Sequence, residues 1–98
     1  VPKIGARLAQ EKLHVRLKRI EGQVAGIRRM SDDGKPCADI LVQIAAVQAA
    51  LGQVSRVLLS DFVAESVDVL ASASSPHARE AHITELLELL RRYGRLEK

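Results

Sequence analysis

The sequence predicts an all-α fold, in which three helices form a protomer around a long central helix. Apolar residues recur at alternating spacings of three and four, no alternating strand pattern occurs, and two short segments carry turn-forming residues. A chain of 98 residues with no Trp is expected to form one domain, residues 1–98, that completes its core with a second chain. We expect helices at about 5–30, 36–71 and 76–93.

The first helix is predicted by an apolar stripe with spacings of 4, 3, 4 and 3, formed by Leu13, Leu17, Ile20, Val24 and Ile27. Gly22 and Gly26 share one face of this helix, and we expect another helix to cross closely there because each glycine costs a helix about 1 kcal/mol. Residues 31–36 then form a break, which ends with Pro36 in the first turn of the next helix.

The second helix carries the same periodicity over a greater length, with Ile40, Ile44, Val47, Leu51, Val54 and Leu58 on its stripe. It spans about 35 residues, or roughly 50 Å, and we interpret it as half of an intermolecular bundle. Ser75 is expected to cap the third helix, Pro76 to occupy its first position, and Gly94 to end it.

Positive charge is concentrated near the start of the chain. Residues 1–30 contain eight Lys and Arg against two acids, whereas residues 31–98 contain seven against ten. Each of four polar residues directly precedes a residue of the apolar stripe. They form an outward-facing basic strip of Lys12, Arg16, Arg19 and Gln23. Lys18 lies on another side. This pattern indicates a polyanion such as nucleic acid, and a solvated helix face is the alternative.

Cys37 is the single cysteine, so an internal disulfide is excluded and a reducing, cytoplasmic compartment is expected. It falls in the first turn of the second helix, where unpaired amides favour a thiolate, although free cysteines are also commonly inert and buried. The three His residues have no ligand spacing, and no nucleophile–base pair or phosphate loop is found. The chain is therefore not expected to be an enzyme.

The segments Arg16-Leu-Lys-Arg-Ile-Glu-Gly-Gln23, Cys37-Ala-Asp-Ile-Leu-Val-Gln-Ile-Ala-Ala-Val-Gln48 and Arg56-Val-Leu-Leu together resemble the CsoR/RcnR/FrmR family. These proteins are bacterial transcriptional repressors that respond to copper, nickel or cobalt, or formaldehyde. The resemblance implies an antiparallel four-helix dimer, a flat homotetramer, and double-stranded operator DNA as partner. Arg16, Arg19 and Gln23 match positions that the family uses for DNA contact, and we add Lys12, Lys18 and Arg56 as candidates.

The resemblance also implies an effector site at Cys37, but the ligand set is incomplete. Where the metal sensors carry their further ligands, this chain has Phe62 and Ser66, and Glu85 occupies the place of a supporting carboxylate. Cu(I) needs two or three soft ligands, and Cys37 supplies only one. A conventional Cu(I) or Ni(II) site is therefore disfavoured. We expect release from DNA through alkylation or oxidation of Cys37. A repressor with a degenerate effector site, or a helical interaction module without DNA function, are the alternatives.

Overall fold

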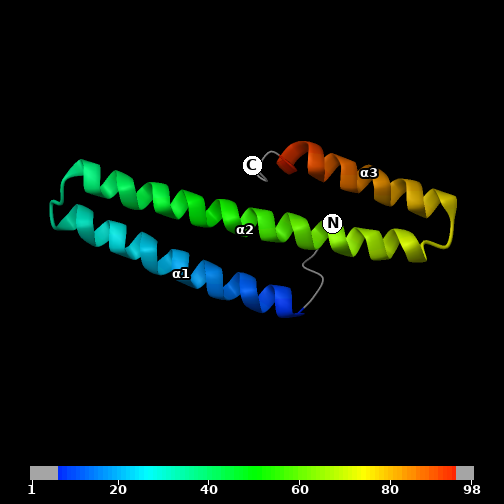
Figure 1. Cartoon of the computed structure of the whole chain (residues 1–98), viewed down its shortest axis with the longest axis horizontal. Coiled ribbons are helices and arrows are strands. Elements are labelled where there is room, and N and C mark those ends of the chain that lie inside the picture. Colours follow the sequence, from blue (N-terminus) through cyan, green and yellow to red (C-terminus); the bar gives the residue numbers. More distant parts are fainter. Residues whose placement is uncertain (1–6, 95–98) are drawn as a thin grey trace.

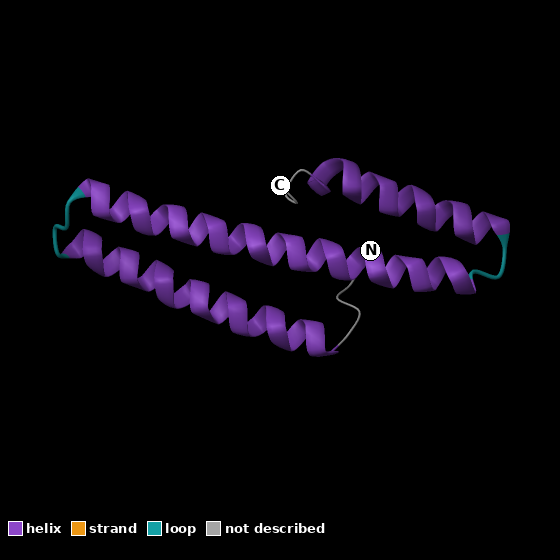
Figure 2. Cartoon of the chain, viewed as in Figure 1, coloured by secondary structure: helices purple, strands orange, loops and turns teal. Residues whose placement is uncertain are grey.

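The computed structural model describes residues 7–94, and these form three helices joined by two short turns (Figures 1 and 2). Helix α1 comprises Arg7–Asp32, α2 comprises Cys37–Ser72 and α3 comprises Pro76–Tyr93. Helix α1 runs antiparallel along the first half of α2, and α3 folds back along the second half (Figure 1). Between residues 7 and 94 no strand occurs, and α1 and α3 contact α2 but not each other. The all-α class and the long central helix are confirmed.

The turn between α1 and α2 begins two residues later than the sequence predicted, because Ser31 and Asp32 still belong to α1. Gly34 adopts a left-handed φ of 68°, and its N–H donates to the carbonyl of Ser31 at 3.1 Å. The N–H of Lys35 donates to the carbonyl of Met30 at 3.0 Å. These two bonds form a Schellman motif, so Gly34 rather than Ser31 determines where the helix ends. The predicted start near residue 5 lies outside the described residues.

Helix α2 begins at Cys37, one residue later than predicted, because Pro36 occupies the N-cap position with φ −55° and ψ 142°. The Pro36 carbonyl accepts the N–H groups of Asp39 and Ile40 at 3.0 and 3.2 Å. At the start of α3 the prediction is confirmed, since Ser75 is the N-cap and its Oγ accepts the N–H of Ala78 at 3.1 Å. Pro76 is the first residue of α3.

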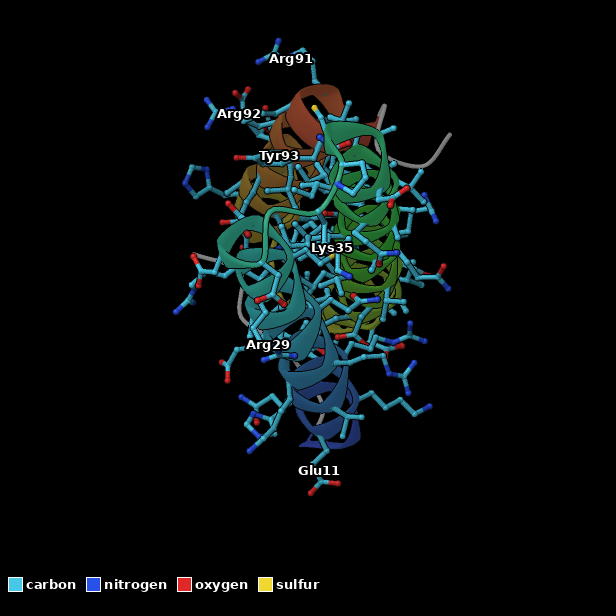
Figure 3. All side chains as sticks on the ribbon, turned by 90° about the vertical axis from the view of Figure 1, so that its left-hand side faces the viewer. Glu11, Arg29, Lys35, Arg91, Arg92 and Tyr93 are labelled. Atoms are coloured by element: carbon cyan, nitrogen blue, oxygen red, sulfur yellow. The ribbon has the colours of Figure 1, made fainter. Side chains whose placement is uncertain are left out.

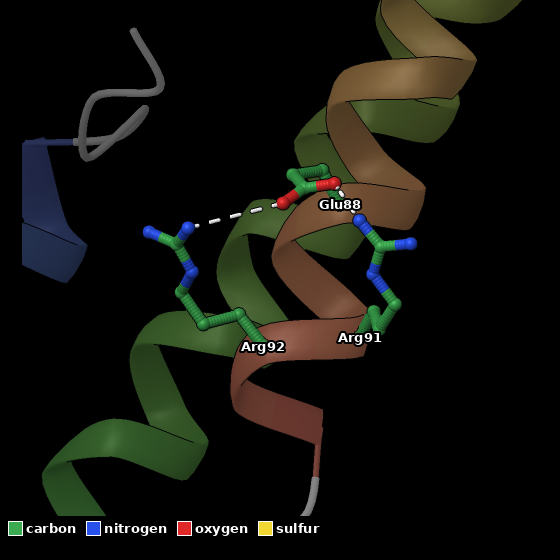
Figure 4. A network of polar contacts seen from close by, with 3 residues as sticks. All are labelled: Glu88, Arg91 and Arg92. Atoms are coloured by element: carbon green, nitrogen blue, oxygen red, sulfur yellow. Dashed lines mark hydrogen bonds and ion pairs between the residues drawn. The ribbon is translucent and has the colours of Figure 1, made fainter.

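The last turn of α3 carries exposed charges that suit a helix C-terminus. Glu88 forms ion pairs with Arg91 and Arg92 one turn further along, the second at 3.9 Å (Figure 4). Since all three side chains are at least half exposed, these pairs contribute little to stability. Helix α3 ends at Tyr93, and Gly94 follows with a right-handed φ of −60°.

The core of the protomer is thin. Ile20 of α1 packs with Val47 and Val54 of α2, and the half-buried side chains around them are Leu13, Ile27, Ala50 and Leu58. Leu17 and Val24 belong to the predicted apolar stripe of α1, yet they remain 43% and 44% exposed. Only one helix covers α1, so a second apolar flank stays open to solvent.

The dimensions of the chain show how much surface remains uncovered. It measures 61 × 26 × 18 Å, with a radius of gyration of 18.1 Å against about 13 Å for a compact domain of this length. It exposes 7491 Å², whereas a compact protein of its mass exposes about 5,500 Å². Helix α2 is long and apolar enough to cross a membrane by length and composition, a test that the core helix of a bundle also meets. The open apolar surface agrees with the expectation of a second chain.

The two glycines of α1 do not mark a helix crossing within the protomer. A Cβ atom added at Gly22 would meet nothing within 4 Å, and one at Gly26 would meet only the Arg29 side chain at 3.7 Å. Both glycines lie more than 100° around α1 from Ile20, which faces α2. The predicted close crossing is therefore wrong for the single chain.

Candidate DNA-binding strip and effector site

The basic strip of α1 lies beside the seam between α1 and α2 and is less uniformly exposed than predicted. Lys12 and Arg19 are exposed, whereas Arg16 and Gln23 are half-buried. The Gln23 Oε1 atom is buried and has no hydrogen-bond partner among the described residues. Ile20, at the centre of the core, sets this orientation, because Arg16 and Gln23 lie on its flank and Arg19 lies further round. Lys12 and Arg19 therefore present their charged groups to solvent along the outer edge of the strip.

Lys18 and Arg56 do not join this strip in one protomer. Lys18 is exposed and lies two residues before Ile20, so it projects about 160° away from the core side of α1. Arg56 is half-buried on α2 and follows Val54 by two residues, which places it about 200° around α2 from the α1 contact. The end of the molecule at the α1–α2 turn carries further basic side chains, of which Arg29 and Lys35 are labelled in Figure 3.

Cys37 is the first residue of α2 and is exposed at the end of the hairpin. Its helix face continues through residues at spacings of 4, 3, 4 and 3, and in the protomer all of these are exposed: Leu41, Ile44, Gln48 and Leu51. We call these five residues the Cys37 stripe. It borders the face that packs against α1, and three of its five residues, Leu41, Ile44 and Leu51, are large apolar side chains left exposed in the protomer.

The other predicted effector residues lie at the far half of α2 and on α3. Phe62 is half-buried and Ser66 is buried at 1% exposure, because α3 covers this part of α2. Glu85 of α3 is exposed. Phe62 follows Cys37 by 25 residues on the same helix, so about 37 Å of α2 separates them. One protomer therefore does not bring the predicted effector residues together.

The donor chemistry at these positions does not fit the ligand set that the resemblance implies. A phenyl ring has no lone pair to offer, and a serine hydroxyl is a poor ligand for a soft ion. Within residues 7–94 of one protomer, no three His, Cys, Asp or Glu side chains lie close enough together to hold a metal ion. The described residues of one protomer therefore do not complete a metal site at Cys37.

One buried polar group on α3 was not among the predicted site residues. His82 of α3 is half-buried, and its Nε2 atom is buried with no hydrogen-bond partner in the described part of the chain. Spacing along the chain assigned no ligand role to this histidine, because no other His or Cys shares a face of its helix at ligand spacing. Counting helical positions outward from the α2–α3 turn along both helices is the comparison that would have drawn attention to His82.

An elongated helical protomer with one basic face and one open apolar face is typical of an oligomeric helical protein that binds a polyanion. The family model described as metal-sensitive transcriptional repressor matches residues 9–92. This chain belongs to that family, and it is a transcriptional repressor of the CsoR type.

Relatives and solved structures agree with this assignment. The chain is 42% identical over 85 residues to the copper-sensing transcriptional repressor CsoR of Bacillus subtilis, covering 86% of this chain and 80% of the relative. The solved structure of the nickel-responsive transcriptional regulator InrS is 34% identical with a TM-score of 0.74, covering 95% of this chain and 98% of that one. A variant of the formaldehyde-responsive regulator FrmR from Salmonella enterica serovar Typhimurium is 36% identical with a TM-score of 0.62, covering 90% and 97%.

Proposed function

We propose that this repressor binds double-stranded operator DNA in the cytoplasm through the basic strip of α1 and is released when an effector acts at Cys37. The observation that carries the proposal is the position of the strip, whose Lys12 and Arg19 stay exposed beside the seam while Ile20 is buried. Arg side chains bind phosphate oxygens through two parallel hydrogen bonds, so such a strip suits a DNA backbone.

Assembly multiplies this charge. The Cys37 stripe offers exposed apolar side chains at regular spacing, and a second copy of the chain is the surface that matches it. We propose an antiparallel dimer centred near the middle of α2, and a dimer of dimers built from it. Two or four strips on one particle would bind a duplex far more strongly than the net charge of +3 per chain suggests.

The effector acts at Cys37, but not through the α2 ligand set of a conventional Cu(I) or Ni(II) site. Phe62 and Ser66 stand where such ligands would be needed, and neither side chain supplies a soft donor. The names of the relatives give different effectors: copper for CsoR, nickel for InrS and formaldehyde for FrmR. The family thus leaves the effector of this chain open, while Cys37 is the residue on which release depends.

The mobility of the purified protein on duplex DNA from upstream of its own gene tests this proposal. We expect a retarded complex, and we expect an agent that reaches Cys37 to release it; Cu(I), Ni(II), formaldehyde and a polysulfide are compared side by side. No complex with any upstream duplex would favour a helical interaction module. A complex that survives every agent would indicate a degenerate effector site.

A further inference from the structure

One flank of α1 carries an apolar and charged pattern that the protomer leaves uncovered. Leu17 and Val24 are 43% and 44% exposed, and Glu21 lies between them at spacings of four and three. Lys18 precedes Glu21 by three residues, and both charged side chains are exposed. Among the described residues, neither of these two side chains forms an ion pair or a hydrogen bond. We call Leu17, Lys18, Glu21 and Val24 the α1 flank.

The α1 flank faces away from the basic strip. Leu17 and Val24 lie about 60° and 40° to one side of Ile20, the core residue of α1. Arg16 and Gln23 lie about 40° and 60° to its other side. Because α1 and α2 are right-handed helices that run antiparallel, the α1 flank and the Cys37 stripe lie on the same side of the hairpin (Figure 1). A second chain can therefore cover both of them while the basic strip stays open on the opposite side.

A second copy of this chain fits the α1 flank, and this step rests on the antiparallel dimer proposed above. The chain exposes 7491 Å², about 2,000 Å² more than a compact protein of its mass, whereas each partner of a standard interface buries about 800 Å². In a two-fold dimer the same patch meets itself, so Leu17 of each chain can face Val24 of the other. That register covers both apolar side chains of the α1 flank at once.

The same register follows from α2. The midpoint between the two apolar residues of the α1 flank lies next to Ile20, which packs with Val47 and Val54 of α2. The two-fold axis therefore passes close to Leu51, the last residue of the Cys37 stripe, which is 44% exposed in the protomer. The two copies of Leu51 meet at this axis when the Cys37 stripes pair antiparallel. Both helices thus place the axis at the same level of the hairpin.

We propose that Glu21 forms an ion pair across this axis with Lys18 of the partner subunit, and that Lys18 forms the symmetric pair with Glu21 of the partner subunit. In the register above, Glu21 lies level with the partner subunit's Ile20. About 3 Å of helix rise then separates it from Lys18 of the partner subunit, which is within reach of a lysine side chain. The two Glu21 carboxylates approach each other at the axis, and the two ammonium groups offset their repulsion.

These four charges fix how the two α1 helices lie against each other. The basic strip belongs to the same helix, so the ion pairs also fix the separation of the two strips in the dimer. Lys18 is thereby assigned to assembly and not to phosphate contact. Leu17 and Val24 of both chains flank the charges and exclude water from them, so a charge reversal there would leave like charges facing each other with little solvent between them.

The test uses two charge reversals in the full-length protein, Lys18→Glu and Glu21→Lys, studied alone and mixed by sedimentation equilibrium. Each variant alone should separate into single chains at a concentration at least about tenfold higher than the wild type does, because only like charges meet at its axis. The equimolar mixture should assemble as the wild type does, since the acids of one variant then meet the bases of the other. Arg79→Glu and Glu80→Lys change exposed neighbours on α3, and as matched controls each should assemble like the wild type.

Mixing separates this proposal from an effect within one chain. If the reversals only weakened the contact between Lys18 and Glu21 of the same helix, the mixture would stay dissociated. That result, or single variants that assemble like the wild type, would overturn the proposal. A wild type that remains a single chain at every concentration would overturn it together with the proposed dimer. Binding of duplex DNA is measured in parallel: an assembled wild type that binds no duplex would refute the proposed function, while the mixing result would still decide the role of Glu21 and Lys18.

Discussion

Cys37 and Phe62 lie on the same face of α2, within about 20° of one another, although about 37 Å of helix separates them. A single protomer can never bring such a pair together, because both belong to one straight helix. An antiparallel partner can, and the exposed Cys37 stripe lies between them. Several properties of the protein should therefore depend on how two copies of α2 pair.

Substitution of Leu41 by Asp should break the dimer. Leu41 belongs to the Cys37 stripe and is 57% exposed in the protomer, so a charge there would be buried against the partner without a counter-charge. We expect sedimentation velocity to show smaller species for Leu41→Asp at concentrations where the wild type is fully assembled.

Val42→Asp is the matched control, because Val42 is 65% exposed and lies about 100° further round the same helix. If the protein did not dimerise through this helix, Asp at these two exposed positions should have equal effects on assembly. Pairing through the Cys37 stripe predicts dissociation for Leu41→Asp and a dimer for Val42→Asp. The reverse pattern would place the interface on the other side of α2.

Removal of Arg19 should weaken DNA binding without unfolding the helix. Its side chain is exposed, so Arg19→Ala leaves the α1–α2 core intact. We expect lower affinity for every duplex, and a log–log salt slope that falls by about one for each phosphate contact removed. Arg79→Ala removes the same charge from the exposed surface of α3 and should leave both quantities unchanged. Equal effects of the two substitutions would mean that only net charge matters.

Cys37→Ser should separate DNA binding from release. The thiol is exposed at the end of the hairpin and takes no part in the core, so the variant should bind duplex DNA within about twofold of the wild type. We expect it to stay bound in the presence of every agent that releases the wild type. If the variant is still released from DNA, the effector acts at a site other than Cys37. If the variant binds no DNA, the thiol is needed for the folded structure and not only for release.

Ser75→Ala should destabilise the protein by about 1 kcal/mol, because the Oγ of Ser75 accepts the Ala78 N–H at the start of α3. Urea denaturation followed by circular dichroism measures the change in the free energy of unfolding. Ser74 neighbours the cap, is exposed, and makes no such cap hydrogen bond. An equal loss for Ser74→Ala would show that turn composition, and not the cap, accounts for the effect.

The helices were predictable because local patterns determine them. Spacings of three and four identify each apolar face, and Ser75 with Pro76 marks the start of α3 to the residue. The end of α1 was placed two residues early because Ser31 and Asp32 are turn formers that a helix also accommodates. The glycine at position 34 was the informative signal there, since only its left-handed φ closes the Schellman motif.

The candidate site was less predictable, because it depends on how helices pack. Sequence spacing correctly assigned Ile20 to the core, yet it could not show that Leu17 and Val24 would remain open on a second flank. Nor could spacing along one helix relate His82 to Ser66, since the register between them depends on the turn at residues 73–75.

The central claim, that this chain is a DNA-binding repressor acting through a multiplied basic strip, is tested most directly by fluorescence anisotropy. The full-length protein is titrated into labelled duplex DNA from upstream of its own gene between 50 and 200 mM salt, with a scrambled duplex of the same length beside it. We predict tighter binding to the upstream duplex and a log–log slope equivalent to about six or more released counterions. Binding that is indifferent to salt, or no binding to either duplex, would contradict the account.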